Sequence, residues 1–127
     1  MSLISPLNRV LGLGSAGGGS EHWWTQRLTA VALVPLGIWF ALSLGSIDLT
    51  SHAAVVAWMQ RPLTAVFLLL TVITIVYHSY LGVQVVVEDY VHSQGSKVTV
   101  LILSAFAHAF LLIAALFAIL KVAFGAV

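Results

Sequence analysis

Three long stretches of this chain contain no charged residue, and they constrain its fold more than any other feature. They cover residues 28–44, 63–87 and 98–120. A helix needs about 20 predominantly apolar residues to cross the ~30 Å hydrocarbon core of a bilayer. With the polar residues at their borders, the stretches predict spans over about 25–45, 63–87 and 98–121. We therefore predict an all-α membrane protein with three transmembrane helices.

Composition supports a membrane environment and excludes several kinds of function. Hydrophobic residues make up 61% of the chain and charged residues 7%, whereas a soluble domain carries about 25% charged residues. The net charge of +1 comes without a basic patch, so we expect no nucleic-acid binding. The absence of cysteine excludes disulfides and thiolate metal sites, and leaves five histidines as candidate metal ligands. No nucleotide-binding loop, serine triad or pair of catalytic carboxylates is present, so the sequence gives no sign of group-transfer chemistry, and we expect such a chain to hold a cofactor that does the chemistry itself.

The polar segments predict how the spans are connected and oriented. Residues 1–24 are predicted to form an N-terminal segment, in which the sequence SAGGGS at 15–20 has the composition of a flexible linker. This segment lacks the pattern of a secretory signal. Residues 45–61 are predicted to be a loop, with a short interfacial helix over 53–59. Lysine and arginine favour the N-terminal side by three to two, which predicts a cytoplasmic N-terminus.

Proline and tryptophan are expected to shape and anchor the spans. Pro35 lies inside the first span and predicts a kink there. Trp23 and Trp24 precede that span, where tryptophan typically anchors a helix at the membrane surface. We interpret Trp39 and Trp58 as lipid or interface anchors rather than cofactor contacts.

His78 is the most informative residue of the second span. It lies fifteen residues after Leu63 and ten before Glu88, which places it near the bilayer midplane. An ionisable residue at that depth is costly and is a candidate functional residue, and imidazole is a common axial ligand of haem iron. Gly82, one turn later on nearly the same face, would let a flat macrocycle approach the backbone. The alternative is a histidine that hydrogen-bonds a neighbouring helix, with Ser79 and Gly82 as a small-residue packing site.

Asp89 and Tyr90 end the second span. At 1.5 Å per residue, Asp89 lies roughly 16 Å along the helix from His78 and within about 20° of the same face. Tyr90 can donate a hydrogen bond at membrane-surface depth, which suits a quinone carbonyl. The alternative is an ordinary helix end with solvated polar residues.

Arg27 and His108 are further candidates, each with a plain structural alternative. Arg27 begins the first span on the same side as Asp89 and suits a haem propionate or a carboxylate. It could instead be a snorkelling arginine or pair with Asp89. His108 of the third span could be a second haem ligand, but its alanine-rich surroundings favour close helix packing with a satisfied histidine.

Two sequence motifs resemble a known family. The first is HSYLGVQVVVEDY at residues 78–90, with a histidine, a glycine four residues on and an Asp-Tyr pair at the helix end. The second is QRLTA at residues 26–30, an arginine followed by a turn into the first helix. Together with the three-span layout, they resemble the smaller of the two hydrophobic membrane anchors of succinate dehydrogenase (succinate:ubiquinone oxidoreductase, respiratory complex II).

The resemblance implies roles for individual residues. It makes His78 the axial ligand of haem b, with Gly82 allowing the haem to pack. It makes Tyr90 the hydrogen-bond donor to ubiquinone, Asp89 the neighbouring acidic residue of that pocket, and Arg27 the arginine near the haem propionates and the quinone.

His22 corresponds by the same resemblance to a histidine near the haem propionates, and no role carries over to His108. The implied partners are a second anchor of cytochrome b type that supplies the other haem ligand, an iron–sulfur subunit and a flavoprotein subunit. The implied location is the bacterial cytoplasmic membrane with a cytoplasmic N-terminus.

The sequence leaves several functions open beside electron transfer from succinate to ubiquinone. The chain could be the anchor of a quinol:fumarate reductase, which runs the reaction in the opposite direction. It could be a purely structural anchor without haem. A self-contained cytochrome using His78 and His108 is a further alternative.

Overall fold

The described part of the chain is helical throughout, apart from short connections. The computed structural model describes residues 17–125. Its helices are α2 (Gly17–Gly45), α3 (His52–Met59), α4 (Pro62–Tyr90) and α5 (Gln94–Ala123). Within these residues, three helices are long and apolar enough to cross a membrane: Glu21–Gly45, Pro62–Tyr90 and Gln94–Ala123. The predicted all-α fold with three transmembrane helices is therefore confirmed.

The helices extend beyond the spans that hydropathy predicted. α2 begins at Gly17 rather than near residue 25, α4 continues to Tyr90, and α5 begins at Gln94. Hydropathy detects the part of a helix that lies in hydrocarbon, whereas backbone hydrogen bonding continues into the headgroup region. Residues 17–20 of the predicted flexible linker are thus helical, and the rest of the predicted N-terminal segment, residues 1–16, lies outside the described residues.

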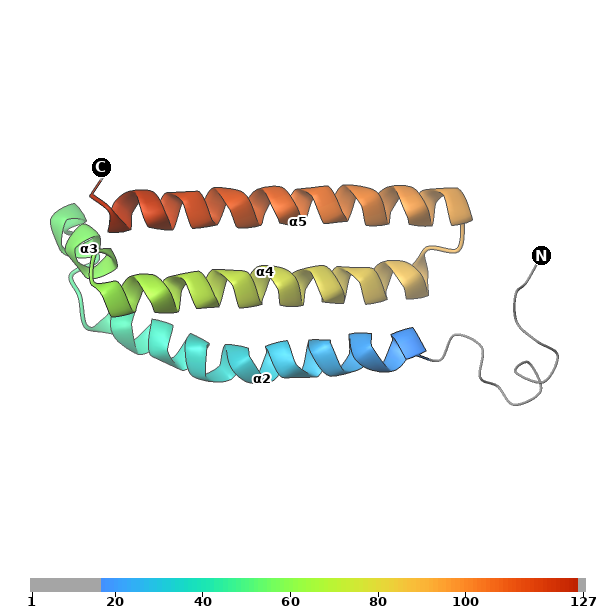
Figure 1. Ribbon diagram of the computed structural model, residues 1–127, viewed down its shortest axis with the longest axis horizontal. Coiled ribbons are helices and arrows are strands. Elements are labelled where there is room, and N and C mark those ends of the chain that lie inside the picture. Colours follow the sequence, from blue (N-terminus) through green and yellow to red (C-terminus); the bar gives the residue numbers. More distant parts are fainter. Residues whose placement is uncertain (1–16, 126–127) are drawn as a thin grey trace.

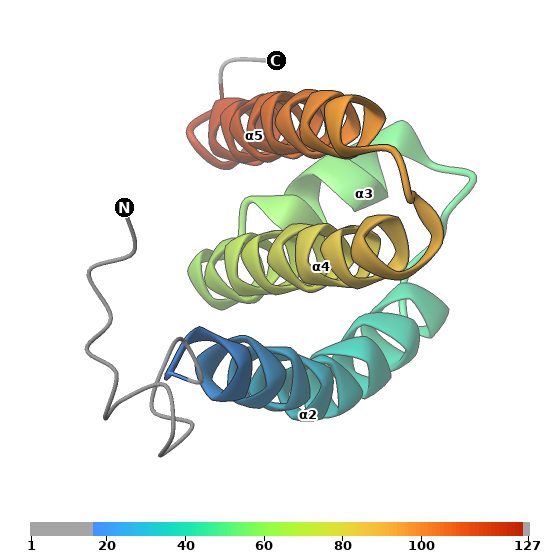
Figure 2. The ribbon, with the colours of Figure 1, turned by 90° about the vertical axis from the view of Figure 1, so that its right-hand side faces the viewer.

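The three long helices form a single layer with α4 in the middle (Figure 1). α4 packs against both α2 and α5, whereas the described parts of α2 and α5 do not contact each other. The end-on view places α2 and α5 on opposite sides of α4 (Figure 2). Polar residues on α4 can therefore face either of two separate helix interfaces.

Large apolar side chains cover much of the outside of this layer. Phe106 is 71% exposed and Phe117 is 69% exposed. Lipid tails are as apolar as these side chains, so such exposure is expected of a membrane-spanning helix. Within α2, Pro35 lies inside the helix, and α2 bends along its length as predicted from the missing backbone donor (Figure 1).

An aromatic cluster joins α3 to the long helices at the end of the layer where the described chain finishes. Trp58 is 6% exposed and packs with Leu68 and Ile119. Trp39 stacks on Trp58 with ring centroids 6.3 Å apart and on Phe67 at 4.9 Å. The interpretation of Trp58 as a lipid anchor is therefore wrong, because α3 folds back over α4 and α5 and buries the indole.

The opposite end of the layer is closed by the short connection from α4 to α5. The Lys97 ammonium donates a hydrogen bond of 3.0 Å to the Glu88 carbonyl in the last turn of α4. A cation in this position satisfies a carbonyl that the helix leaves unpaired and complements the helix dipole. The contact fixes the end of α4 that carries the predicted polar residues.

Candidate functional site

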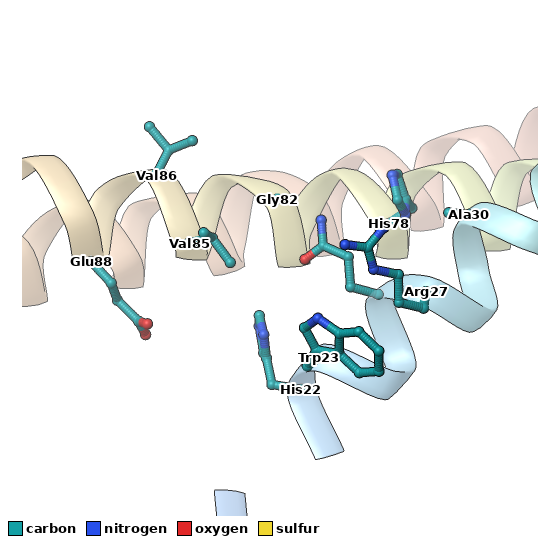
Figure 3. Close-up of a pocket in the computed structure, with 10 residues that line it drawn as sticks. His22, Trp23, Arg27, Ala30, His78, Gly82, Val85, Val86 and Glu88 are labelled. Carbon is teal, nitrogen blue, oxygen red and sulfur yellow. The ribbon is translucent and has the colours of Figure 1, made fainter. Parts of the chain in front are cut away.

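A groove of about 970 Å³ opens between α2 and α4. It lies along the first half of α2 and the second half of α4, which run antiparallel (Figure 3). The groove brings together four of the six predicted site residues, His22, Arg27, His78 and Gly82. Its other lining residues are Trp23, Gln26, Ala30, Val85, Val86 and Glu88.

His78 lines this groove from near the middle of α4. The ring is half-buried, and its Nδ1 lies 2.9 Å from the Thr29 hydroxyl of α2. Within the described residues, Nε2 has no hydrogen-bond partner. A histidine that served only to join two helices would be satisfied through its polar atoms. His78 instead has one ring nitrogen bonded to α2 and one without a partner among the described residues.

Gly82 leaves space in the groove one turn after His78. A β-carbon built at this position would meet only the side-chain amide nitrogen of Gln26, at the ordinary contact distance of 3.6 Å. Helix packing within this chain therefore does not require a glycine here. The missing side chain instead leaves the groove open at this position of α4.

Arg27 places a cation in the groove from α2. Its guanidinium carbon lies 5.3 Å from the centroid of the Trp23 ring, within range of a cation–π interaction. The residue is exposed, and Asp89 is not among the groove-lining residues. The guanidinium is therefore held beside the groove by an aromatic face, and among the described residues none of its five donors has a hydrogen-bond partner.

His22 is tied to α4 by a chain of side chains that the sequence did not indicate. Its Nε2 lies 3.2 Å from Oε1 of Gln84, and the Gln84 amide donates to the Tyr80 hydroxyl at 3.1 Å. Because the Gln84 oxygen can only accept, neutral His22 donates through Nε2 and leaves Nδ1 as an acceptor. His22 can therefore donate to a propionate only as an imidazolium. The polar Gln84 inside an apolar span was the sequence signal that could have revealed this chain of side chains.

Asp89 and Tyr90 lie beyond the groove in this chain. The acidic residue that lines the groove is Glu88, and its side chain points to the side from which α2 enters (Figure 3). Tyr90 is 77% exposed at the last position of α4. Sequence spacing placed Asp89 near the same face of α4 as His78. Which residues line the groove depends also on where α2 packs along α4, and Asp89 is not one of them. The two predicted quinone residues are thus at the helix end, open to contact from outside the chain.

His108 belongs to the other interface of α4. Its Nδ1 donates to the Ser104 carbonyl of its own helix at 2.8 Å, and its Nε2 lies 3.2 Å from the Ser79 hydroxyl of α4. The Tyr80 ring also packs edge-on against the imidazole, with centroids 5.5 Å apart. Both nitrogens are therefore occupied, which agrees with the interpretation of a satisfied packing histidine.

Comparison with known proteins places this arrangement in a family. The sequence matches the succinate dehydrogenase/fumarate reductase transmembrane subunit family over residues 1–123. The chain belongs to this family.

Similarity to individual proteins supports the same family assignment. The chain is 40% identical over 90 residues to the succinate dehydrogenase hydrophobic membrane anchor subunit of Rickettsia bellii, covering 70% of this chain and 71% of the relative. It is 35% identical over 94 residues to the same subunit of Rickettsia conorii, covering 71% and 72%. With that of Paracoccus denitrificans it shares 29% identity over 127 residues, 100% of this chain and 98% of the relative. The resemblance to a hydrophobic membrane anchor subunit is confirmed.

Within the described residues of this family member, no group of three or more histidine, cysteine or acidic side chains could hold a metal ion. His78 and His108 lie at different interfaces: His78 of α4 bonds Thr29 of α2, and His108 of α5 bonds Ser79 of α4. They are therefore not placed to ligate one metal between them. Two imidazoles line the groove, and they differ in which nitrogen is bonded: Nε2 of His22 lies 3.2 Å from Oε1 of Gln84, whereas Nδ1 of His78 lies 2.9 Å from the Thr29 hydroxyl.

Proposed function

We propose that this membrane anchor subunit of succinate dehydrogenase supplies one axial ligand to a haem b and part of a ubiquinone site. The observation that carries the proposal is His78, which lies near the middle of a membrane span with Nδ1 bonded to Thr29 and Nε2 without a partner among the described residues. Uncoordinated nitrogens of this kind are costly in hydrocarbon, which makes them functional candidates.

The residues around His78 fit a haem. The groove has a volume of about 970 Å³, Gly82 opens one wall, and Arg27 supplies a cation for a propionate. When bound, haem supplies one-electron chemistry at a potential set by its axial ligands. In this proposal, the second ligand comes from a second anchor of cytochrome b type, because His108 is bonded to Ser104 and Ser79 and His22 is bonded to Gln84.

The end of α4 fits a ubiquinone site at the membrane surface. Tyr90 is exposed there and its hydroxyl can donate a hydrogen bond to a quinone carbonyl. Asp89 adds a carboxylate beside it, and Glu88 lines the neighbouring groove. A quinone bound at this end would accept electrons from an iron–sulfur subunit, which would receive them from the flavoprotein that oxidises succinate.

The arrangement of charges supports a cytoplasmic location for this end of the layer. Arg27 and Lys97 lie at the end where α4 meets α5, whereas Arg61 and Lys121 lie at the other. With Arg9 of the N-terminal segment, the sequence retains its excess of cations on the proposed cytoplasmic side. We accordingly propose a bacterial cytoplasmic membrane with the groove opening nearer its inner surface.

The test is the haem spectrum of the assembled complex carrying His78→Ala. We expect the haem b band of the reduced-minus-oxidised spectrum to be lost, since one axial ligand is removed. Succinate oxidation by an artificial dye should persist, because it needs only the flavoprotein and iron–sulfur subunits. An unchanged haem spectrum in an assembled complex would rule the ligand assignment out.

The family also contains fumarate reductase subunits, so the physiological direction needs its own measurement. We expect the purified complex to reduce ubiquinone with succinate faster than it reduces fumarate with menaquinol. The reverse ratio would assign the chain to a quinol:fumarate reductase.

A further inference from the structure

Thr29 lies at the point where α2 meets His78. Its hydroxyl oxygen lies 2.9 Å from Nδ1 of His78, 2.9 Å from the Thr25 carbonyl and 3.0 Å from the Gln26 carbonyl. The residue is half-buried on the face of α2 that packs against α4. Its sequence context does not single it out, because threonines in membrane helices commonly bond their own backbone.

The number of donors and acceptors on the Thr29 hydroxyl limits which hydrogen bonds it can make. A threonine has one O–H donor and two acceptor lone pairs. The two carbonyls can only accept, so a hydroxyl that donates to either of them is free to accept from Nδ1–H of His78. Both hydrogen bonds then have a defined direction. Nδ1–H of His78 donates to the Thr29 hydroxyl, and the Thr29 hydroxyl donates to a backbone carbonyl of α2.

We propose that Thr29 is the positioning residue that fixes the tautomer and the ring orientation of His78. This inference rests on the proposed function, because its purpose is to present Nε2 as a lone pair toward the groove. Ligating histidines generally donate their other ring N–H to a partner that orients the ring and raises its basicity. In this chain, that partner is a hydroxyl of the neighbouring helix.

Among the described residues, no side chain forms a hydrogen bond with Nε2 of His78. Ala30 and Gly82 line the groove near His78, and neither carries a polar side-chain atom. His108 provides the contrast, since the Ser79 hydroxyl lies 3.2 Å from its Nε2. Both imidazoles have Nδ1 bonded, and the difference between them lies in what surrounds Nε2.

The side chain of Thr29 is suited to a fixed position. Branching at the β-carbon restricts its first torsion in a helix, and the bond to the carbonyl of residue i−4 selects one rotamer. The hydroxyl is therefore oriented by α2 itself before a ligand reaches His78. A serine retains the donor and the acceptor but loses the methyl group, so it should preserve this role more fully than valine, which retains only the shape.

The test compares Thr29→Val and Thr29→Ser in the assembled complex, with Thr71→Val as the matched control. Thr71 lies two turns before His78, and its hydroxyl bonds the Phe67 carbonyl of its own helix at 2.7 Å. The measurements are haem per complex, the g values of the ferric haem and its midpoint potential. The last two report the electronic state of the ligand, which a purely structural role would leave unchanged.

We expect Thr29→Val to weaken haem retention, roughly 10- to 100-fold in affinity as for other lost partners of metal-ligating histidines. We also expect its midpoint potential to become more positive, because an imidazole without a hydrogen-bond acceptor stabilises ferric iron less. Thr29→Ser and Thr71→Val should match the wild type in all three measurements.

A Thr29→Val complex with wild-type haem content, g values and potential would overturn the proposal. So would failure of both Thr29→Val and Thr29→Ala to assemble while Thr71→Val assembles, because Thr29 would then serve packing. His78→Ala separates this inference from the proposed function. If His78→Ala keeps its haem, the ligand assignment fails; if it loses haem while Thr29→Val behaves as wild type, only the role of Thr29 fails.

Discussion

Each interface of α4 contains one histidine near the middle of a membrane span, and the hydrogen bonds of these two histidines differ. At the α2 interface, His78 lines a groove of about 970 Å³ and bonds Thr29 through Nδ1, while Nε2 has no partner among the described residues. At the α5 interface, His108 bonds Ser104 through Nδ1 and Ser79 through Nε2. Depth in the membrane is therefore not enough to identify a ligand. The nitrogen that remains without a protein partner distinguishes a candidate binding site from a packing contact.

The largest expected effect comes from filling the groove between α2 and α4. Gly82→Leu would place a bulky side chain in the groove beside His78, and we expect haem content to fall on the order of tenfold or more, since the surroundings of a ligand control its metal affinity. Gly37→Leu is the matched control, because a β-carbon at Gly37 of α2 has no neighbour within 4 Å. Haem per assembled complex is the measurement. Equal haem in both variants would mean that the groove does not receive the cofactor.

The second prediction concerns the end of α4 outside both interfaces. Tyr90→Phe should lower quinone reduction by succinate about tenfold, the equivalent of one lost hydrogen bond of roughly 1.4 kcal/mol. Tyr77→Phe is a suitable control, because that tyrosine is 45% exposed on the apolar α4–α5 side. Steady-state rates with ubiquinone and with an artificial dye separate a defect of the quinone site from a failure of the complex to assemble. Parallel loss of both rates would indicate failed assembly and not a defect of the quinone site.

The third prediction concerns the interface between α4 and α5. Ser79→Ala should leave Nε2 of His108 without its partner and reduce the free energy of unfolding by about 0.6 kcal/mol, the average for hydrogen bonds between membrane helices. The haem spectrum should not change, because we assign His108 no ligand role. Denaturant unfolding and a difference spectrum of the same preparation provide the measurements. A spectral change without loss of stability would contradict the division between the interfaces.

The smallest expected effect lies in the loop before α3. The Asp48 carboxylate accepts hydrogen bonds from the Thr50 hydroxyl at 2.7 Å and the Thr50 backbone N–H at 2.9 Å, and these lower the pKa of Asp48 below its usual 3.8. Because the folded-state pKa is the lower one, the stabilisation is complete above pH 3.8 and is lost as the pH falls through the folded value.

Thr50→Val should move the pKa of Asp48 back toward its usual value. A carbon-detected NMR titration of the carboxyl group would measure this shift. The haem spectrum and the quinone rate should remain unchanged, since Asp48 and Thr50 are exposed and neither lines the groove. An identical titration curve in the variant would exclude the Thr50 hydroxyl as a cause of the lowered pKa.

The sequence was sufficient for the features that depend on local chemistry. Uncharged runs marked the three spans, and the isolation of His78 in the second of them marked a candidate ligand. Span ends were less predictable, since helices continue into polar surroundings, as α4 does to Tyr90. These features depend on the hydrophobicity and the length of one helix, and both can be read from the sequence of that helix alone.

Features that depend on how two helices meet could not be predicted. The chain contains several threonines and serines in its spans, and most of the threonines bond only their own helix. Nothing local distinguishes Thr29 or Ser79 from them, because the register of packed helices decides which hydroxyl crosses an interface. The same reason explains why Glu88 rather than Asp89 lines the groove and why Trp58 is buried.

The most direct test of the difference between the two interfaces is a paired haem spectrum of complexes carrying His78→Ala or His108→Ala. Both variants remove one imidazole from a membrane-spanning helix, so they differ chiefly in which interface loses it. We predict that the reduced-minus-oxidised haem b signal disappears in His78→Ala and remains at the wild-type level in His108→Ala. A haem signal that survives His78→Ala, or that disappears equally in both assembled complexes, would contradict this prediction.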